Sequence, residues 1–400
     1  MASNSWQPQV HDSGNIQVTI LASEWGSSKG GLSTLNRELA LQLAKFVGVK
    51  ISFFLPKCTE EDMEEANSHG ISIFESTTRD GDDELEWLKF PPDHLQIDVV
   101  FGHGVKLGRQ AQVIRDNYKC KWVQVVHTDP EELGMFKSYE KGISRGEIKL
   151  AHEVKLCQSA DFVVAVGPKL TEAYRKYLCW CKQVQDVFEF TPGLFSDFAS
   201  VQQVPEERKH RSVLVFGRGD AEDFMLKGFD IAGRSVAALP DTNLVFVGAP
   251  DGKHEEIANL FIELGVPEKR LKVRRYINSR EELKRQLCEV DLVIMPSRAE
   301  GFGLTGLEAL SAGLPVIVSK NSGFGEALGK ITFGSGFVID SDNPSTWEAA
   351  IKGIWNKDKE TRLHEAKLLR HYYGERYSWY DQCNGLLETI GTLVYGTHSI

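Results

Sequence analysis

Short apolar runs alternate with longer amphipathic segments along the whole chain. The runs are rich in β-branched residues and end at turn residues, as in strands that are buried on both faces. Between them, apolar residues recur at the spacing of one helix face. In the first half we predict strands at Ile16–Ala22, Val49–Leu55, Ile71–Phe74, Ile97–Phe101, Trp122–Val126 and Phe162–Val166, and helices at Leu32–Phe46, Gly108–Asn117, Ile148–Gln158 and Lys169–Tyr177.

This alternation stops near Phe190 and restarts after a polar stretch, Ser196–His210, which we interpret as an interdomain linker. In the second half we predict strands at Ser212–Phe216, Asn243–Val247, Leu271–Val273, Leu292–Met295, Pro315–Val318 and Gly336–Ile339, and helices at Lys227–Ala238, His254–Leu264, Arg280–Cys288, Gly303–Ala312 and Ser345–Trp355, followed by a helical tail with a break near Gly374. The pattern predicts an α/β protein with two doubly wound, Rossmann-like domains, residues 1–200 and 201–375. Such sheets bind ligands at the carboxyl ends of their strands, so the expected site is the cleft between them.

Composition narrows the classes of function. Lys and Arg total 46 against 56 Asp and Glu, a formal net charge of −10, which argues against a nucleic-acid partner. Seven cysteines without repeated pairs indicate reduced thiols. The N-terminal residues carry no apolar leader, and the apolar runs are too short to cross a membrane. We therefore expect a cytoplasmic protein, monomer or homodimer, with no transmembrane segment.

The segment Pro296–Leu310 carries the strongest chemical signal. It follows a buried strand and opens a helix, with Gly301 and Gly303 allowing close backbone approach. The first-turn amides of Gly303, Leu304 and Thr305 would point at an anion. Glu300 would lie beside a phosphate and sugar, and Glu308 would reach vicinal ribose hydroxyls. The alternative is that Glu300 is a helix cap and Glu308 a solvated surface residue.

Two cations follow the first strand of the second half. Arg218 stands in Phe216-Gly-Arg-Gly, and Lys227 begins the next predicted helix. A guanidinium can fork across two diphosphate oxygens, and an ammonium adds a point charge. The alternative is that both are surface cations of an ordinary loop.

Three positions of the first half are further candidates. Gly30-Gly31 lies between a strand and a helix, where it serves either a phosphate or only a tight turn. His103 and His127 each follow a strand. We interpret His103 as a structural hydrogen-bonding residue and His127 as functional, because Asp129-Pro130 indicates a rigid loop at the cleft. No metal site is predicted, since neither histidine has a second histidine or a cysteine two to four residues on.

Because these residues and motifs occur in this order along the chain, it resembles the GT-B-fold retaining glycosyltransferases of family 4. The likeness is strongest over Val213–Glu326 and includes the Glu300-x7-Glu308 motif. It implies an acceptor-binding first domain, a donor-binding second domain, and a final helix within residues 376–400 that crosses back to the first domain. It also implies roles for single residues: Arg218 and Lys227 at the donor diphosphate, Glu308 at the ribose, Glu300 and His127 at the sugar, and the backbone of Phe302, Gly303 and Leu304 at the phosphates. Gly31 would contact either the phosphate or the acceptor side.

The resemblance implies a metal-independent hexosyltransferase without a cofactor, using a nucleotide sugar, with UDP-sugars favoured, and a small-molecule or glycan acceptor. Base recognition is expected around Arg274–Tyr276, so Arg275 and Tyr276 join the candidate donor-binding residues. Two alternatives remain at this point: a nucleotide-sugar epimerase of the same fold, and a sugar-nucleotide-binding sensor or scaffold.

Overall fold

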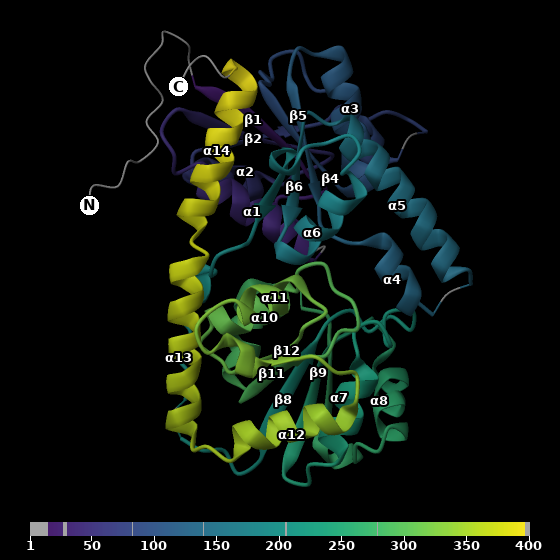
Figure 1. Ribbon diagram of the computed structural model, residues 1–400, viewed down its shortest axis with the longest axis vertical. Coiled ribbons are helices and arrows are strands. Elements are labelled where there is room, and N and C mark those ends of the chain that lie inside the picture. The colour runs from purple at the N-terminus through teal and green to yellow at the C-terminus, as the bar shows by residue number, and fades with distance from the viewer. Residues whose placement is uncertain are drawn as a thin grey trace.

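The computed structural model describes residues 15–26, 30–81, 83–138, 140–204, 206–277 and 279–396. It has two α/β domains stacked along its long axis, each with a parallel sheet between layers of helices (Figure 1). The predicted fold class is confirmed.

The first sheet has seven strands in the order β3-β2-β1-β4-β5-β6-β7. Its strands are β1 (Ile16–Leu21), β2 (Val49–Leu55), β3 (Ile71–Glu75), β4 (Val99–His103), β5 (Lys121–Val126), β6 (Phe162–Val166) and β7 (Val187–Phe190). The helices of this part are α1 (Gly31–Leu43), α2 (Glu60–Ser68), α3 (Gly104–Asn117), α4 (Pro130–Phe136), α5 (Gly142–Ser159) and α6 (Pro168–Tyr177), with the 3-10 turns η1 (Glu84–Lys89), η2 (Val184–Asp186) and η3 (Ser196–Phe198).

The second sheet has six strands in the order β10-β9-β8-β11-β12-β13. Its strands are β8 (Arg211–Phe216), β9 (Thr242–Ala249), β10 (Leu271–Arg275), β11 (Leu292–Met295), β12 (Val316–Ser319) and β13 (Val338–Ile339). The helices are α7 (Phe229–Ala237), α8 (His254–Glu263), α9 (Arg280–Cys288), α10 (Leu304–Ser311), α11 (Gly323–Gly329), α12 (Pro344–Trp355), α13 (Lys359–Arg376) and α14 (Trp379–Tyr395), with the 3-10 turns η4 (Glu268–Arg270) and η5 (Gly334–Phe337).

Several elements were not expected from the sequence, among them α2, α4, α11 and β7. Helix α2 buries only Ala66 among its nine residues, so it has no apolar stripe to reveal it. It is instead stabilised at its start, where Thr59 and Asp62 form a reciprocal capping box. Strand β7 was missed because Glu189 interrupts its apolar residues, so it lacks the continuous apolar run by which the other short strands were recognised.

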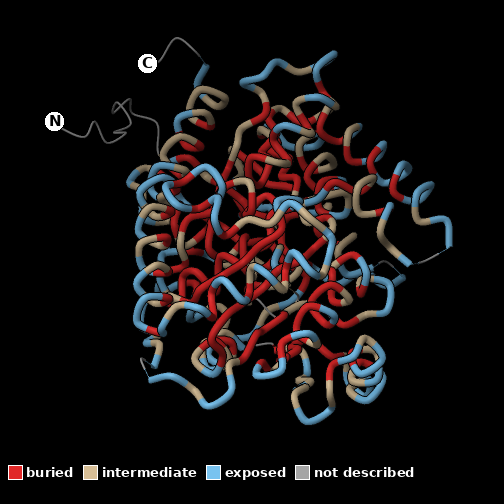
Figure 2. Tube along the Cα trace, turned by 60° about the horizontal axis from the view of Figure 1, so that its bottom comes forward, coloured by how far each residue is buried: buried red, intermediate tan, exposed pale blue. Residues whose placement is uncertain are grey.

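The buried residues gather in the interior of the molecule, and the exposed ones lie at its periphery (Figure 2). One apolar cluster runs through both domains, because residues such as Phe195, Phe302 and Phe324 belong to the same contact network as the two sheets. The domains therefore share a continuous hydrophobic contact, and the cleft between them is partly filled by side chains.

The C-terminal helices tie the two domains together, α13 running along the second domain and α14 along the first (Figure 1). The Tyr373 hydroxyl donates to the Pro192 carbonyl at 2.8 Å, and the indole of Trp379 donates to the Leu194 carbonyl at 3.0 Å. Tyr380 stacks on Phe46 of the first domain with ring centroids 5.1 Å apart. The last helix thus crosses back to the first domain as the resemblance implied.

Candidate active site

The loop between β11 and α10 brings a helix N-terminus to the cleft. Gly303 precedes α10 with φ +99°, and a β-carbon there would come within 2.6 Å of the Met295 methyl group. The N-cap residue, Gly303, has no side chain to cap this helix, and Leu304 and Thr305, its first two residues, line a cavity of the cleft. Uncapped first-turn amides carry partial positive charge and favour an anion.

Glu300 and Lys227 form an ion pair at this loop. The Lys227 ammonium lies 2.5 Å from Glu300 Oε2, and the Ser297 hydroxyl donates to the same oxygen at 3.4 Å. Lys227 lies just before α7, not within it as predicted. The reason is Gly228, which has φ +66° and packs so closely that a β-carbon would lie 2.0 Å from the Pro296 carbonyl oxygen. This contact holds Lys227 beside the end of β11.

A cavity between the domains collects residues from both. It is lined by Gly30, Gly31, Thr34, Phe216, Tyr276, Ile277, Ser279, Arg280, Leu283, Leu304, Thr305 and Glu308. Gly30 has φ +108°, and a β-carbon on it would lie 3.5 Å from Arg218 Nη2 and 3.8 Å from the Tyr276 hydroxyl. The N-terminus of α1 therefore faces that of α10 across the cavity. Ser27–Lys29, the rest of this predicted turn, lies outside the described residues.

Glu308 is buried in this cavity and is paired with Arg280. Burial raises the pKa of the Glu308 carboxyl to about 7, although Arg280 Nη1 lies 3.2 Å from it and acts to lower this pKa. Arg280 also binds both oxygens of Asp197, at 2.6 and 3.1 Å, and lies over the rings of Phe195 and Phe198. The arginine thus joins α9 and α10 to the segment that follows β7.

The two candidate histidines contact each other. His103 Nδ1 and His127 Nε2 are 2.9 Å apart, so one nitrogen donates and the other accepts. Burial lowers the pKa of His127 to about 4 and that of His103 well below its usual value, so both rings are neutral near pH 7. The backbone of His127 meets the Glu300 loop directly, because a β-carbon on Gly301 would lie 1.9 Å from the His127 carbonyl oxygen.

A sequence model of the family described as "Family 4 Glycosyltransferase in conflict systems" matches residues 19–386. The chain belongs to this family. This glycosyltransferase is 26% identical over 332 residues to the D-inositol 3-phosphate glycosyltransferase of Corynebacterium urealyticum, covering 76% of this chain and 74% of that one. It is 24% identical over 389 residues to the enzyme of the same name from Corynebacterium efficiens, covering 89% and 85%.

Solved structures share the fold. Sucrose-phosphate synthase from Thermosynechococcus elongatus superposes with a TM-score of 0.76 at 18% identity, covering 96% of this chain and 100% of that one. HepE of Anabaena, in complex with UDP and glucose, has a TM-score of 0.69 at 15% identity, covering 94% and 100%. At such identities these likenesses concern the fold alone.

The structure of this glycosyltransferase brings most of the predicted site residues to the cleft. Gly30, Gly31, Tyr276, Leu304, Thr305 and Glu308 line the cavity, with Arg218 beside Gly30. The other predicted residues are not among those that line it: His127, Arg218, Lys227, Arg275, Glu300, Phe302 and Gly303. The Arg275 side chain is 68% exposed and faces Glu282, while the Phe302 ring packs against Gly167 and Phe324. No sequence signal marked Arg280, which falls inside an ordinary amphipathic helix pattern.

Two of the acidic residues that follow Arg218 contact the first domain. Glu222 and Asp223 pair with Lys137 of the first domain, and the Glu222 carbonyl accepts from the Ser138 amide at 3.3 Å. These acids therefore contribute to contact between the domains near the end of α4.

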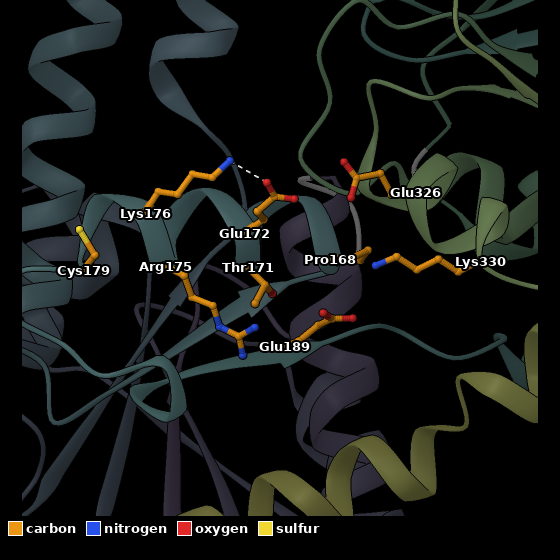
Figure 3. A pocket seen from close by; sticks show the side chains of 9 residues that line it. All are labelled: Pro168, Thr171, Glu172, Arg175, Lys176, Cys179, Glu189, Glu326 and Lys330. Atoms are coloured by element: carbon orange, nitrogen blue, oxygen red, sulfur yellow. Dashed lines mark hydrogen bonds and ion pairs between the residues drawn. The ribbon is translucent and has the colours of Figure 1, made fainter.

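A separate hollow of about 550 Å³ lies between α6 and α11 (Figure 3). Glu172, Arg175 and Lys176 of α6 form one wall, and Glu326 and Lys330 lie opposite on the second domain. Within the described ranges, no cluster of three or more His, Cys, Asp or Glu is placed to hold a metal ion. In that same part of the chain, no helix is long and apolar enough to cross a membrane.

Proposed function

We propose that this glycosyltransferase transfers a hexose-type sugar from a UDP-sugar to a hydroxyl acceptor, with retention of anomeric configuration and without a divalent metal. The observation that carries the proposal is the set of groups around the N-terminus of α10: Lys227 paired with Glu300, whose side chain lies beside Gly303, together with Arg218 beside Gly30 and the first-turn amides of the helix. Together they bring a guanidinium, an ammonium paired with Glu300, and helix amides toward a diphosphate, the task that a metal ion performs elsewhere.

The cavity itself, which Tyr276 and Glu308 line, suits a nucleoside. Tyr276 supplies a half-buried phenol, and the Glu308 carboxyl can accept hydrogen bonds from vicinal hydroxyls. The preference for uracil rests on the HepE structures, which are described with UDP and UDP-glucose. The acceptor would approach from the first domain, on the side of the cleft where His127 meets Gly301.

In the proposed reaction, the bond between the anomeric carbon and the diphosphate oxygen breaks. The acceptor oxygen then bonds to the same face of that carbon and passes its proton to the departing phosphate oxygen. Arg218, Lys227 and the α10 amides stabilise the growing negative charge on the leaving group. Removing one such charge should lower turnover on the order of 100-fold or more.

The function is tested in two steps. A thermal-shift screen of UDP-, GDP- and ADP-sugars identifies the donor, because ligand at 100 times its dissociation constant adds roughly 2.7 kcal/mol of stability. The product is then analysed by NMR for its anomeric configuration, with and without EDTA. Donor binding without transfer or hydrolysis would favour a sensor or scaffold. Interconversion of the donor sugar without an acceptor would favour an epimerase. A product of inverted configuration, or a loss of activity in EDTA, would contradict the proposed mechanism.

A further inference from the structure

Lys169, in the first turn of α6, reaches from the first domain to the second. Its ammonium donates to Glu132 Oε1 at 2.8 Å, to the Asn321 carbonyl at 2.8 Å and to the Glu300 carbonyl at 3.3 Å. A lysine ammonium has three N–H donors, so these three acceptors match its capacity. Two of them belong to the backbone of the second domain, which makes this side chain a polar latch across the cleft.

The carbonyls that Lys169 binds lie where two loops of the second domain are joined. The Glu300 amide donates to the Asn321 carbonyl at 3.1 Å, and Glu300 pairs with Ser322 in an isolated parallel bridge. Lys169 therefore holds the backbone of Glu300 at the same point at which the second domain itself fixes it. From this fixed backbone the Glu300 side chain extends to Lys227, whose Nζ lies 2.5 Å from Glu300 Oε2.

On the first domain, the Glu132 carboxylate fixes the position of the Lys169 ammonium. Asp129 accepts hydrogen bonds from the amides of Glu131 and Glu132 at 3.1 and 3.2 Å, which anchors the first turn of α4. The pKa of Glu132 is raised, chiefly by burial and also by the nearby carboxylates of Asp129 and Glu300, while Lys169 acts to lower it. The ammonium therefore separates acidic groups that would otherwise repel one another as the domains close.

The surfaces around the latch fit only when the domains are together. Gly301 packs on the His127 carbonyl, and a β-carbon on Gly167 would lie 2.6 Å from the Phe302 ring. These contacts leave little room for the Glu300 loop to shift. The three hydrogen bonds of Lys169 add direction to this shape fit, since each needs the second domain's carbonyls at one position.

We propose that Lys169 is a positioning residue that couples closure of the domains to the placement of Glu300 beside Lys227. The inference deepens the proposed function and rests on it, because Glu300 matters to transfer only if the donor binds there. Lys169 touches the backbone of Glu300 and not the reacting groups, so its effect on the reaction passes through Glu300.

The test compares Lys169→Met, which removes the ammonium and keeps an unbranched apolar chain, with Lys169→Arg, which keeps the charge. Lys176→Met is the matched control, since Lys176 lies on the same helix, 72% exposed and paired only with Glu172 within the described chain. We expect Lys169→Met to lower kcat about tenfold or more, which is roughly 1.4 kcal/mol. Nucleotide affinity and Tm should stay at control values, because the nucleotide contacts lie mainly on the second domain, and Lys169→Arg should recover much of kcat.

Closure is measured separately by small-angle X-ray scattering of the ligand-free protein, where Lys169→Met should have a larger radius of gyration than the wild type and Lys176→Met should not. The inference is overturned if Lys169→Met keeps both kcat and the wild-type radius. It is also overturned if activity, Tm and nucleotide affinity fall together and arginine restores none of them, because that pattern marks a purely structural lysine. If the wild type transfers no sugar while the radius of gyration still depends on Lys169, the proposed function is contradicted, but the role of Lys169 in holding the domains together stands.

Discussion

The guanidinium of Arg280 lies 3.2 Å from the carboxylate of Glu308, and the same guanidinium binds Asp197 through two nitrogens. The pair stands where the proposed donor ribose would bind, so Glu308 already has a cationic neighbour before any ligand arrives. Even so, burial keeps the pKa of Glu308 near 7. The ionisation of one carboxyl therefore links stability and ligand binding to pH.

Replacing Glu308 with Gln should change how stability depends on pH. The folded pKa of about 7 exceeds the ordinary glutamate pKa of 4.5, so between these values the folded state binds more protons than the unfolded state. Wild-type stability should therefore fall as pH rises from 4.5 to 7, by at most on the order of 3 kcal/mol. The Tm of Glu308→Gln relative to wild type should increase between pH 5 and pH 8. Glu281→Gln, at a 77% exposed glutamate, is the control, and parallel Tm profiles would contradict the assignment.

Breaking the ion pair between Lys227 and Glu300 should abolish most turnover. We expect Lys227→Met to lower kcat on the order of 100-fold or more, because it removes a cation beside the leaving group, and Glu300→Gln to lower kcat by a similar factor, because the carboxylate no longer holds Lys227 in place or accepts from the sugar. Initial rates with the identified donor measure the effect. Lys320→Met is a suitable control, since Lys320 is an exposed lysine with its own carboxylate partner, Asp340. Full activity in either site variant would show that the diphosphate binds elsewhere.

Gly301→Ala should prevent the two domains from closing. The added methyl group would meet the His127 carbonyl oxygen at 1.9 Å, an overlap with backbone that no rotamer change relieves. We expect a loss of kcat at least as large as that of Lys169→Met, with a larger radius of gyration in scattering. Gly353→Ala, where nothing lies within 4 Å on a helix, should be neutral or slightly stabilising. A Gly301→Ala protein with wild-type kcat would mean that transfer does not need this contact.

The histidine pair should make the protein sensitive to acid. Burial lowers the pKa of His127 from 6.5 to about 4, so between these values the unfolded state binds more protons. The contribution of His127 is then fully present above pH 6.5 and is lost as pH falls toward 4. The Tm of His127→Gln should fall less steeply over this range than that of wild type or of His371→Gln, a change at an exposed histidine. Proton NMR showing a ring that titrates near 6.5 would refute the prediction.

The parts predicted well from sequence are those in which neighbouring residues carry the information. Strands β6 and β11 were predicted to the residue, because both are apolar on both faces and end at turn signals. The loop from Glu300 to Glu308 was recognised for a similar reason, since its glycines, helix start and carboxylates all lie within one short segment.

Arg280 and Lys169 could not be predicted in the same way. Each sits on a helix where a cation is usually solvated, and each finds its partners far away along the chain. Lys169 and Asn321 are 152 residues apart, and Arg280 and Asp197 are 83 apart. Such pairs depend on how the two sheets are placed relative to each other, which the periodicity of a single segment does not contain. The same holds for Phe302, whose ring is received by Gly167 of the other domain.

The return of α14 to the first domain affects the order in which the molecule can be completed. Leu386, Leu387 and Ile390 are buried in the common apolar cluster, although they follow every strand of both sheets. While the chain is being synthesised, the surface around α1 that packs against these residues stays exposed until the whole second domain has been made. The first domain to emerge is therefore the last to be finished, and a nascent chain that stalls before Trp379 would present that apolar surface to chaperones.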